Sequence, residues 1–278
     1  MALAPFGRRL LTVAGIDELG AYRLLRVSDP DGPPPAPGQF AMLAAAAGWG
    51  GGQDERPHLP RAFSYARVVP GGEASFLLED VGPGTRRLCE LRGGERIWSL
   101  GPLGVGFSAP ADGRRAILLG GGVGIAPLAI WQDVLLAGAS ARRTSGAEPP
   151  VILLGFRDRA RAAGAALLAD ARVATDDGSV GHHGLVTELL TAELVRDPHA
   201  SVYACGPAPM LEAVRALCAE RAIPAQLALE SGMACGFGAC FGCVVPRRGG
   251  GYLRVCVDGP VIDAAELQCV DEHAGAPA

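Results

Sequence analysis

The chain contains no lysine. All 25 basic residues among its 278 residues are arginines. A chain without lysine has neither a Schiff-base lysine nor the lysine of a Walker-type nucleotide loop. The formal net charge is only −4, so no surplus of basic side chains indicates a nucleic acid or an anionic membrane as partner.

The chain also lacks a long apolar segment. No hydrophobic run approaches the roughly 18 residues of a membrane-spanning helix, and the N-terminus has no signal-peptide core followed by a cleavage site. We therefore expect a cytoplasmic protein, in which reduced cysteines stay free to bind metal. Its length, with 49% hydrophobic residues, allows two domains with cores of their own and a small third unit.

Four of the eight cysteines lie close together near the C-terminal end. Cys235, Cys240, Cys243 and Cys256 have the spacing C-x4-C-x2-C-x12-C. The first three cysteines are spaced as in plant-type ferredoxins, in which four thiolates bind a 2Fe-2S cluster. Glycines stand between them, and glycine lets a loop turn tightly and bring its backbone N–H groups close to a cluster. The pattern therefore predicts an iron–sulfur site.

Two other interpretations of these cysteines stay open. A structural zinc ion also takes four cysteines, although its usual pattern has two C-x2-C pairs and this chain has one. Structural or disulfide-bonded cysteines are the third possibility, although nothing marks the chain as secreted. The remaining cysteines, which we expect to be small buried residues, are Cys89, Cys205, Cys218 and Cys269.

Residues 1–110 have the pattern of a small antiparallel barrel. Short segments of strand-forming residues alternate there with turns rich in proline and glycine. Residues 44–60 have neither a strand period nor a helix period, and we expect them to form a long exposed loop. The expected strands cover residues 23–27, 40–43, 62–69 and 74–79.

Residues 111–227 change to an alternation of strands and helices. Uninterrupted apolar runs predict strands buried on both faces, and segments with apolar residues at helical spacing follow them. This alternation predicts a doubly wound parallel sheet, whose ligands bind beyond the C-terminal strand ends. We expect strands at 116–119, 151–155, 171–175 and 201–205, and helices at 128–137, 185–194 and 210–221. Residues 228–278 carry the cysteines and form the third unit, with a frayed tail at 271–278.

Two motifs of the expected barrel are suited to a flavin nucleotide. In Arg61-Ala62-Phe63-Ser64, the arginine can clamp a pyrophosphate, the aromatic ring can pack on a flavin, and the serine can hydrogen-bond a ring nitrogen. The turn at 82–85 presents N–H groups and the Thr85 hydroxyl to a phosphate. An ordinary edge strand and an ordinary Gly-Pro turn are the alternatives.

Two motifs of the expected sheet are suited to a nicotinamide nucleotide. The loop at 120–127, with Gly121, Gly122 and Gly124, follows a strand and opens a helix, where N–H groups receive a phosphate. It is not the G-x-G-x-x-G fingerprint, and a turn without ligand is the alternative. Cys205 ends the last expected strand, so we expect it at the catalytic position, lining the nicotinamide site without acting as a nucleophile. Its alternative is a buried cysteine before a Gly-Pro turn.

The ordered series of motifs resembles the electron transfer subunits of dihydroorotate dehydrogenase B, a family within the ferredoxin–NADP reductase superfamily. The resemblance covers nearly the whole chain. Its specific segments are 230–236 and 256–261, joined by the C-x4-C-x2-C spacing. The segments that are generic in the superfamily are 37–40, 61–64, 82–85, 101–107, 120–128, 175–179 and 205–207.

The resemblance implies FAD in the barrel, NAD in the second domain and a 2Fe-2S cluster at the C-terminus. By position, Arg61 would hold the FAD pyrophosphate, Ser64 would face the flavin ring, and the four cysteines would bind iron. Further contacts with FAD would come from Gly84 and Thr85 and from the backbone near Leu77, Leu78 and Glu79.

The resemblance also implies a partner, a separate FMN-containing subunit that oxidises dihydroorotate in pyrimidine biosynthesis, joined with this chain in a heterotetramer. We therefore expect a relay in which electrons pass singly through the cluster to FAD and leave as a hydride to NAD+. A reductase component for an oxygenase or a hydrogenase is the alternative, and a zinc-stapled interaction module is a rival of another class. NAD and NADP stay undecided, because Arg157 and Arg159 suit a ribose phosphate and Asp158 between them opposes it.

Overall fold

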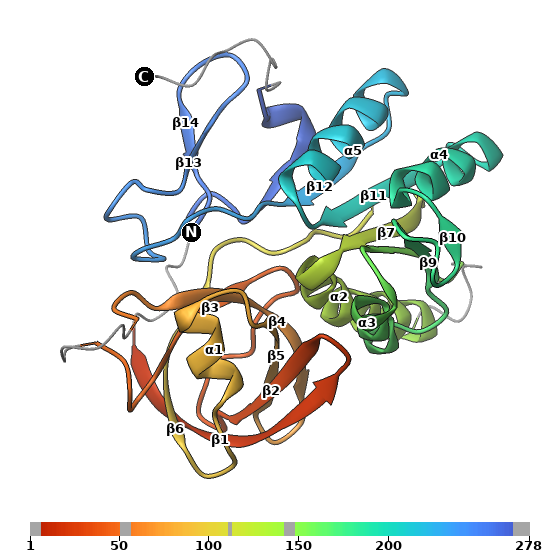
Figure 1. Cartoon of the computed structure of the whole chain (residues 1–278). Coiled ribbons are helices and arrows are strands. Elements are labelled where there is room, and N and C mark those ends of the chain that lie inside the picture. The colour runs from red at the N-terminus through yellow and green to blue at the C-terminus, as the bar shows by residue number, and fades with distance from the viewer. Residues whose placement is uncertain (1–6, 51–56, 111–112, 142–147, 269–278) are drawn as a thin grey trace.

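The computed structural model describes residues 7–50, 57–110, 113–141 and 148–268. Figure 1 shows a barrel, an α/β part beside it, and a C-terminal segment that lies against both. Within the described ranges, no helix combines the length and the apolar character that a membrane crossing needs. Part of the expected loop at 44–60 and the whole expected tail at 271–278 lie outside these ranges.

The N-terminal strands close into a six-stranded barrel with the order β1-β2-β5-β4-β3-β6. All its neighbouring strands are antiparallel, and buried residues such as Leu25 and Val27 alternate with more exposed ones. The four expected strands are confirmed, whereas β1 and β6 were not predicted. The elements are β1 (Arg8–Leu19), β2 (Tyr22–Ser28), β3 (Phe40–Ala45), β4 (Arg61–Val69), β5 (Glu73–Glu79), α1 (Pro83–Cys89) and β6 (Arg96–Leu103).

The second part is built on a seven-stranded sheet with the order β10-β9-β8-β7-β11-β12-β15. Its strands are parallel except β15, which pairs antiparallel with β12. The expected parallel sheet is confirmed, but β11 is not its last strand, because β12 and β15 continue it. The strands are β7 (Arg115–Gly121), β8 (Val151–Phe156), β9 (Arg172–Thr175), β10 (His182–His183), β11 (Ala200–Cys205), β12 (Ala225–Ala228) and β15 (Val261–Asp263).

Helices cover both faces of this sheet, as a doubly wound sheet requires (Figure 1). Leu128 of α2 packs into a core that also contains Tyr22 of the barrel. Leu190 of α4 and Val214 of α5 pack into the core on the other face. The helices are α2 (Ala126–Ala141), α3 (Arg159–Ala162), α4 (Val186–Arg196) and α5 (Ala208–Glu220), with short 3-10 turns η1 (Gly122–Ile125), η2 (Ala163–Leu167) and η3 (Ala264–Glu266).

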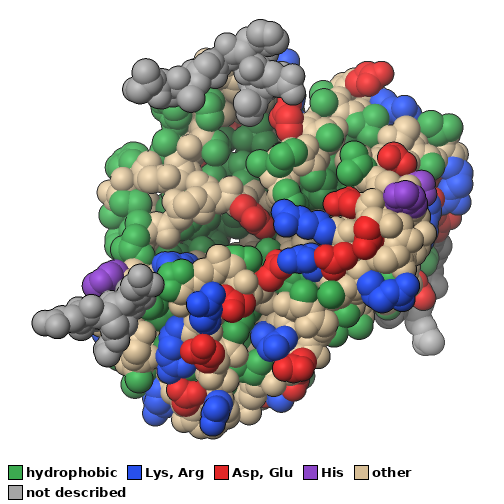
Figure 2. Space-filling model, viewed as in Figure 1, with side chains coloured by type: hydrophobic (Ala, Val, Ile, Leu, Met, Phe, Trp, Pro, Cys, Tyr) green, Lys and Arg blue, Asp and Glu red, His purple; other side chains and the backbone are tan. Residues whose placement is uncertain are grey.

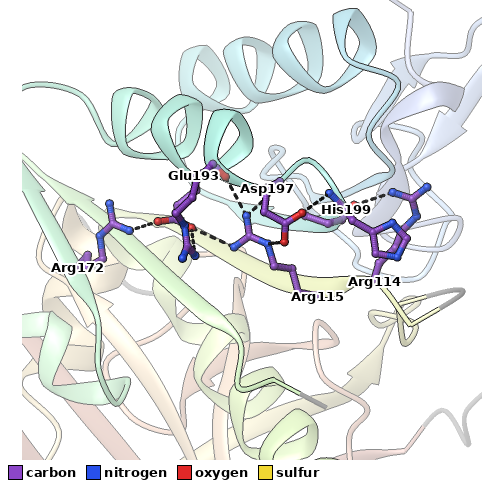
Figure 3. Close-up of polar contacts among 8 residues, drawn as sticks. Arg114, Arg115, Arg172, Glu193, Asp197 and His199 are labelled. Carbon is purple, nitrogen blue, oxygen red and sulfur yellow. Dashed lines mark hydrogen bonds and ion pairs between the residues drawn. The ribbon is translucent and has the colours of Figure 1, made fainter. Parts of the chain in front are cut away.

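A buried ion-pair network joins β7 to α4 (Figure 3). The side chains of Arg115 and Glu193 are only 5% and 6% exposed, and Arg115 Nη1 donates to Glu193 Oε2 at 3.0 Å. Glu193 also pairs with Arg172 and Arg196. Burial opposes the charged carboxylate, but hydrogen bonds from these three arginines outweigh it and lower the pKa of Glu193 to about 2.

The C-terminal segment joins two cores instead of forming a separate layer. Leu253 and Ile262 pack against the sheet and α5, whereas Val255 packs against Phe40 and Leu103 of the barrel. The segment therefore fixes the cysteine loop to the barrel. The boundaries expected at 110/111 and 227/228 stay a prediction. The two strands of its hairpin are β13 (Val244–Pro246) and β14 (Tyr252–Arg254).

Candidate functional site

Two cavities adjoin where the barrel, the sheet and the C-terminal segment meet. The first, of about 220 Å³, lies between β4 and the end of β11. The second, of about 540 Å³, lies over the C-terminal ends of the sheet strands. Val123 and Glu230 line both cavities. Figure 2 shows the molecular surface hollowed between the barrel and the C-terminal segment. Two molecules bound in these cavities would therefore meet at one wall.

The barrel side of the first cavity contains four of the expected flavin residues. Ala62, Phe63 and Ser64 of β4 line it together with Leu77 of β5. Leu78 points the other way and is buried in the barrel core, because successive side chains of a strand alternate between faces. Leu78 therefore presents no side chain to a ligand in this cavity, and only its backbone can contact one.

Arg61 lies against the first turn of α1. A Cβ on Gly84 would lie 2.6 Å from Arg61 Nε and 2.8 Å from Cζ, so the guanidinium occupies the space that a side chain would fill. Its Nη1 donates to the carbonyl of Leu59 at 2.6 Å. The Thr85 hydroxyl shapes the turn itself, since it accepts from Val81 N at 2.9 Å and donates to Gly82 O at 3.0 Å. The guanidinium and the helix N–H groups thus form a cradle of positive potential suited to a phosphate.

The glycine loop between β7 and α2 lines both cavities. Gly121 and Gly122 face the second cavity and Gly124 faces the first. A Cβ on Gly124 would lie 2.5 Å from the carbonyl oxygen of Cys205, so the loop and the end of β11 approach backbone to backbone. Gly122 has φ +56°, a conformation that favours glycine. The glycines are therefore required by close approach and by backbone conformation.

Cys205 is buried at the end of β11 and lines the first cavity. Burial raises the pKa of its thiol well above the usual value, and the nearby charge of Glu230 acts in the same direction. The thiol is therefore neutral at physiological pH. A neutral thiol fits the expectation that Cys205 lines the site without acting as a nucleophile.

Glu230 belongs to the segment 230–236 that carries the resemblance, but the sequence did not predict it as a site residue. It follows β12, a strand that the sequence did not predict, and it lines both cavities. Surrounding protein atoms desolvate this carboxyl and raise its pKa, although the residue as a whole is exposed. Among the described residues, it has no hydrogen-bond or ion-pair partner. An acidic residue directly after a strand of a parallel sheet is the signal that could have identified it.

The second cavity carries charged residues of both signs. Arg157 and Asp176 line it, at the ends of β8 and β9. Arg159 donates instead to the carbonyl of Ser179 at 2.5 Å. Asp158 pairs with Arg161 at 2.6 Å. Of Arg157, Asp158 and Arg159, which the sequence analysis considered for a ribose phosphate, Arg157 therefore lines the cavity. The sequence did not predict Asp176 as a lining residue.

Glu79 connects the barrel to this cavity. Its carboxylate lines the cavity wall and accepts from Arg161 Nε at 2.9 Å.

Two histidines that are consecutive in the sequence, His182 and His183, are exposed, and His182 Nε2 lies 2.7 Å from Glu188 Oε2.

The four cysteines of the C-terminal segment lie as two thiol pairs. Cys243 Sγ is 3.2 Å from Cys256 Sγ, and the thiol of Cys240 hydrogen-bonds Cys235. Among the described residues, no three His, Cys, Asp or Glu side chains are gathered so as to hold one metal ion. A structural zinc ion needs four ligands around one centre, whereas a 2Fe-2S cluster has two irons, each of which takes two thiolates. The paired arrangement favours the binuclear cluster.

The loop also supplies hydrogen-bond donors to sulfur. Burial opposes ionisation of the Cys235 thiol, but N–H donors of the loop outweigh it and lower its pKa to about 6. The donors are Phe237, Ala239 and Cys240. In Cys256, burial and the neighbouring Cys243 raise the pKa to about 12. Ionising the Cys256 thiol at physiological pH therefore requires a bound cation, and metal binding there would release its proton.

Comparison with known proteins agrees with this geometry. Residues 230–268 match the family model described as the iron-sulfur cluster binding domain of dihydroorotate dehydrogenase B. Among solved structures, the chain is similar to that of an NADH-dependent reduced ferredoxin-NADP oxidoreductase, with a TM-score of 0.75, 23% identity, and coverage of 95% of this chain and 91% of that one. A ferredoxin reductase of carbazole 1,9a-dioxygenase gives a TM-score of 0.66 at 21% identity, covering 80% of this chain and 68% of that one. These two show the fold.

Curated relatives show the family. The dihydroorotate dehydrogenase B (NAD(+)) electron transfer subunit of Geobacillus kaustophilus (strain HTA426) is 38% identical over 240 residues, which cover 83% of this chain and 86% of that protein. Its counterpart in Geobacillus sp. (strain WCH70) is 35% identical over 238 residues, covering 84% and 86%. The chain therefore belongs to the family of dihydroorotate dehydrogenase B (NAD(+)) electron transfer subunits.

Proposed function

We propose that this chain relays electrons from a dihydroorotate-oxidising subunit to NAD+ through a 2Fe-2S cluster and FAD. The observation that carries the proposal is the order of the three sites. Cys243 and Cys256 pack against Phe40, and Phe40 lines the first cavity. The first cavity shares the wall of Val123 and Glu230 with the second. The sites for cluster, flavin and nicotinamide therefore follow one another in a row.

The first cavity and the turn beside it fit FAD. Phe63 and Leu77 offer apolar surface to a flavin ring, and Ser64 offers a hydroxyl. Arg61, which lies in the space left by Gly84, would hold the pyrophosphate. When bound, a flavin accepts electrons singly and releases them as a pair, which is what a link between an iron–sulfur cluster and a nicotinamide requires.

The second cavity fits NAD. The N–H groups of Gly121 and Gly122 would receive its phosphates, at the point where β7 gives way to a helix. Cys205 lines the first cavity, so its neutral thiol would border the nicotinamide only where the nicotinamide reaches past the shared wall toward the flavin. Asp176 would face a ribose hydroxyl.

The partner would be an FMN-containing catalytic subunit, joined with this chain in a cytoplasmic heterotetramer. Apolar side chains stand exposed around the cysteine loop and the hairpin, namely Phe237, Phe241, Val244 and Tyr252. Phe241 is 61% exposed and Tyr252 is 71% exposed. A group of large apolar side chains in solvent is typical of an interaction surface. Docking there would bring the partner's flavin close to the cluster.

The test is anaerobic reconstitution with the catalytic subunit. We expect iron, acid-labile sulfide and FAD in the purified complex, and bleaching of the cluster and FAD absorbance by dihydroorotate, reversed by NAD+. Cys240→Ser should lose the cluster and dihydroorotate-driven bleaching of FAD, while FAD binding and reduction by NADH persist. The control is Cys89→Ser, which lies in α1 outside the loop.

Other outcomes contradict the proposal. Zinc without sulfide would make the chain a zinc-stapled module. Bleaching by NADH, with none by dihydroorotate in the presence of the catalytic subunit, would favour a reductase for an oxygenase or a hydrogenase.

A further inference from the structure

Arg254 places a positive charge on the cysteine loop. It is the last residue of β14, and its Nη1 lies 3.3 Å from the position that a Cβ on Gly238 would take. Its Cζ lies 5.7 Å from the ring centroid of Phe241. The guanidinium therefore lies over the loop that carries three of the four cysteines.

Gly238 separates this guanidinium from a cysteine. The backbone N–H of Gly238 hydrogen-bonds the thiol of Cys256, and its φ of +85° turns the chain there. The backbone of Gly238 thus lies next to both the Arg254 guanidinium and the Cys256 thiol, beside Val257, whose Cγ2 lies 2.7 Å from the same Cβ position. In such a position a charge acts on the sulfur at short range.

The backbone of Arg254 is held by the turn that carries Cys256. Its N–H donates to Asp258 Oδ2 at 2.7 Å, and its carbonyl accepts from the N–H groups of Val257 at 2.9 Å and Asp258 at 2.8 Å. The side chain is oriented by the same carboxylate, with Nε 3.6 Å from Asp258 Oδ2. Arg254 and Asp258 therefore form an oriented pair with the guanidinium on the side of the loop.

We propose that the positive charge of Arg254 raises the reduction potential of the cluster, and that the negative charge of Asp258 partly offsets this rise. The inference rests on the proposed function. A 2Fe-2S cluster with four thiolates is anionic, and reduction adds one electron with no bond made or broken, so the reduced form gains more from a nearby cation. Net charge and surroundings are known determinants of cluster potentials. Arginine stays protonated throughout.

The test compares variants by EPR-monitored redox titration of the whole chain. Arg254→Gln should lower the midpoint potential and Asp258→Asn should raise it. For Arg254→Gln we expect up to about a tenfold fall in the ratio of reduced to oxidised cluster at fixed ambient potential, equivalent to about 59 mV for a one-electron couple. Arg254→Lys, which keeps the charge, should stay near wild type. The control is Arg247→Gln, whose side chain pairs with Glu266 at 2.8 Å.

If Arg254→Gln and Asp258→Asn shifted the midpoint potential in the same direction, the inference would be overturned. Removing opposite charges must shift the potential in opposite directions, whereas a structural disturbance has no reason to change sign between the two variants. A shift in Arg254→Lys as large as in Arg254→Gln would also overturn it. If Arg254→Gln does not bind a cluster, the midpoint potentials of Asp258→Asn and Arg254→Lys decide whether the inference holds. Absence of iron and sulfide from the wild-type chain would instead refute the proposed function, so the two failures are distinct.

Discussion

At the scale of single residues, Gly84 tests the flavin cradle most directly. A methyl group there would lie within 2.8 Å of the Arg61 guanidinium, whereas a methyl group on Gly82 would meet nothing within 4 Å. We expect Gly84→Ala to displace Arg61 and weaken FAD binding by about tenfold, the loss of roughly one charge-assisted hydrogen bond. Fluorescence titration of the apoprotein with FAD measures it.

Gly82→Ala is the matched control, because Gly82 has an extended backbone that any residue adopts. It should bind FAD like the wild type. Equal affinities in the two variants would mean that Arg61 does not hold the cofactor.

Asp176 gives a second test at the residue scale, since it lines the second cavity, as Arg157 does. A carboxylate beside the ribose repels the 2′-phosphate of NADP. Asp176→Ser should therefore raise the kcat/KM ratio of NADPH over NADH by at least about tenfold, roughly the effect of one charge contact. NAD(P)H oxidation with an artificial electron acceptor measures it.

The neighbouring Asp177 provides the control. Its carboxylate accepts from Ser179 N at 2.9 Å, and the residue does not line the cavity. Asp177→Asn should leave the ratio unchanged. An unchanged ratio in Asp176→Ser would remove Asp176 from the ribose site.

At the scale of elements, the contact between β7 and α4 predicts a specific acid sensitivity. The pKa of Glu193 is lowered from 4.5 to about 2. A lowered carboxyl pKa stabilises the fold above the pKa of the unfolded chain, near 4.3, and that stability is lost as pH falls toward about 2. The shift corresponds to roughly 3 kcal/mol. Glu193→Gln should therefore flatten the fall in unfolding free energy between about pH 5 and pH 2.

Urea denaturation at several pH values measures this slope. The control is Glu266→Gln in η3, which removes the exposed pair that Glu266 forms with Arg247 at 2.8 Å. An exposed pair contributes little to stability. A slope in Glu193→Gln as steep as that of the wild type would contradict the role given to the network.

Local pattern was sufficient for some elements and insufficient for others. The apolar run of β7 and the helical spacing of α5 identified both elements. In β1 the pairing register shifts between Val13 and Gly15, so the alternation that marks a strand is interrupted. In β15, three residues form a strand only because β12, far away in the sequence, offers them a free edge.

At the scale of the whole molecule, the site consists of contacts between parts of the chain that are distant in sequence. The sequence identified the wall-forming motifs one by one, including Ser64, Gly124 and Cys205. It did not identify Glu230 or Asp176 as wall residues, because their positions depend on how the sheet ends meet the barrel and the C-terminal segment. Pairing of the four thiols in space follows from the fold of the loop and is equally absent from the spacing alone.

The position of the barrel against the sheet should depend on the ion pair of Glu79 and Arg161. Their atoms approach to 2.8 Å, and their side chains are 18% and 30% exposed. A partly buried pair that joins two parts of a molecule holds less mobile side chains than a surface pair and is less screened by solvent. We expect a double-mutant cycle of Glu79→Gln and Arg161→Gln to give a coupling energy of about 1 kcal/mol in urea denaturation. Each of the two substitutions should also weaken NADH binding, because both side chains line the second cavity.

The control cycle uses Asp80 and Arg86, an exposed pair at 3.3 Å within the barrel. Its coupling energy should be close to zero, because solvent screens both charges. The comparison separates a surface contact from one that fixes the two halves of the nucleotide site relative to each other. If the two cycles gave equal coupling, the barrel would owe its position to the apolar contacts of Tyr22 with the core under α2, and NADH affinity would then follow core substitutions instead of charge.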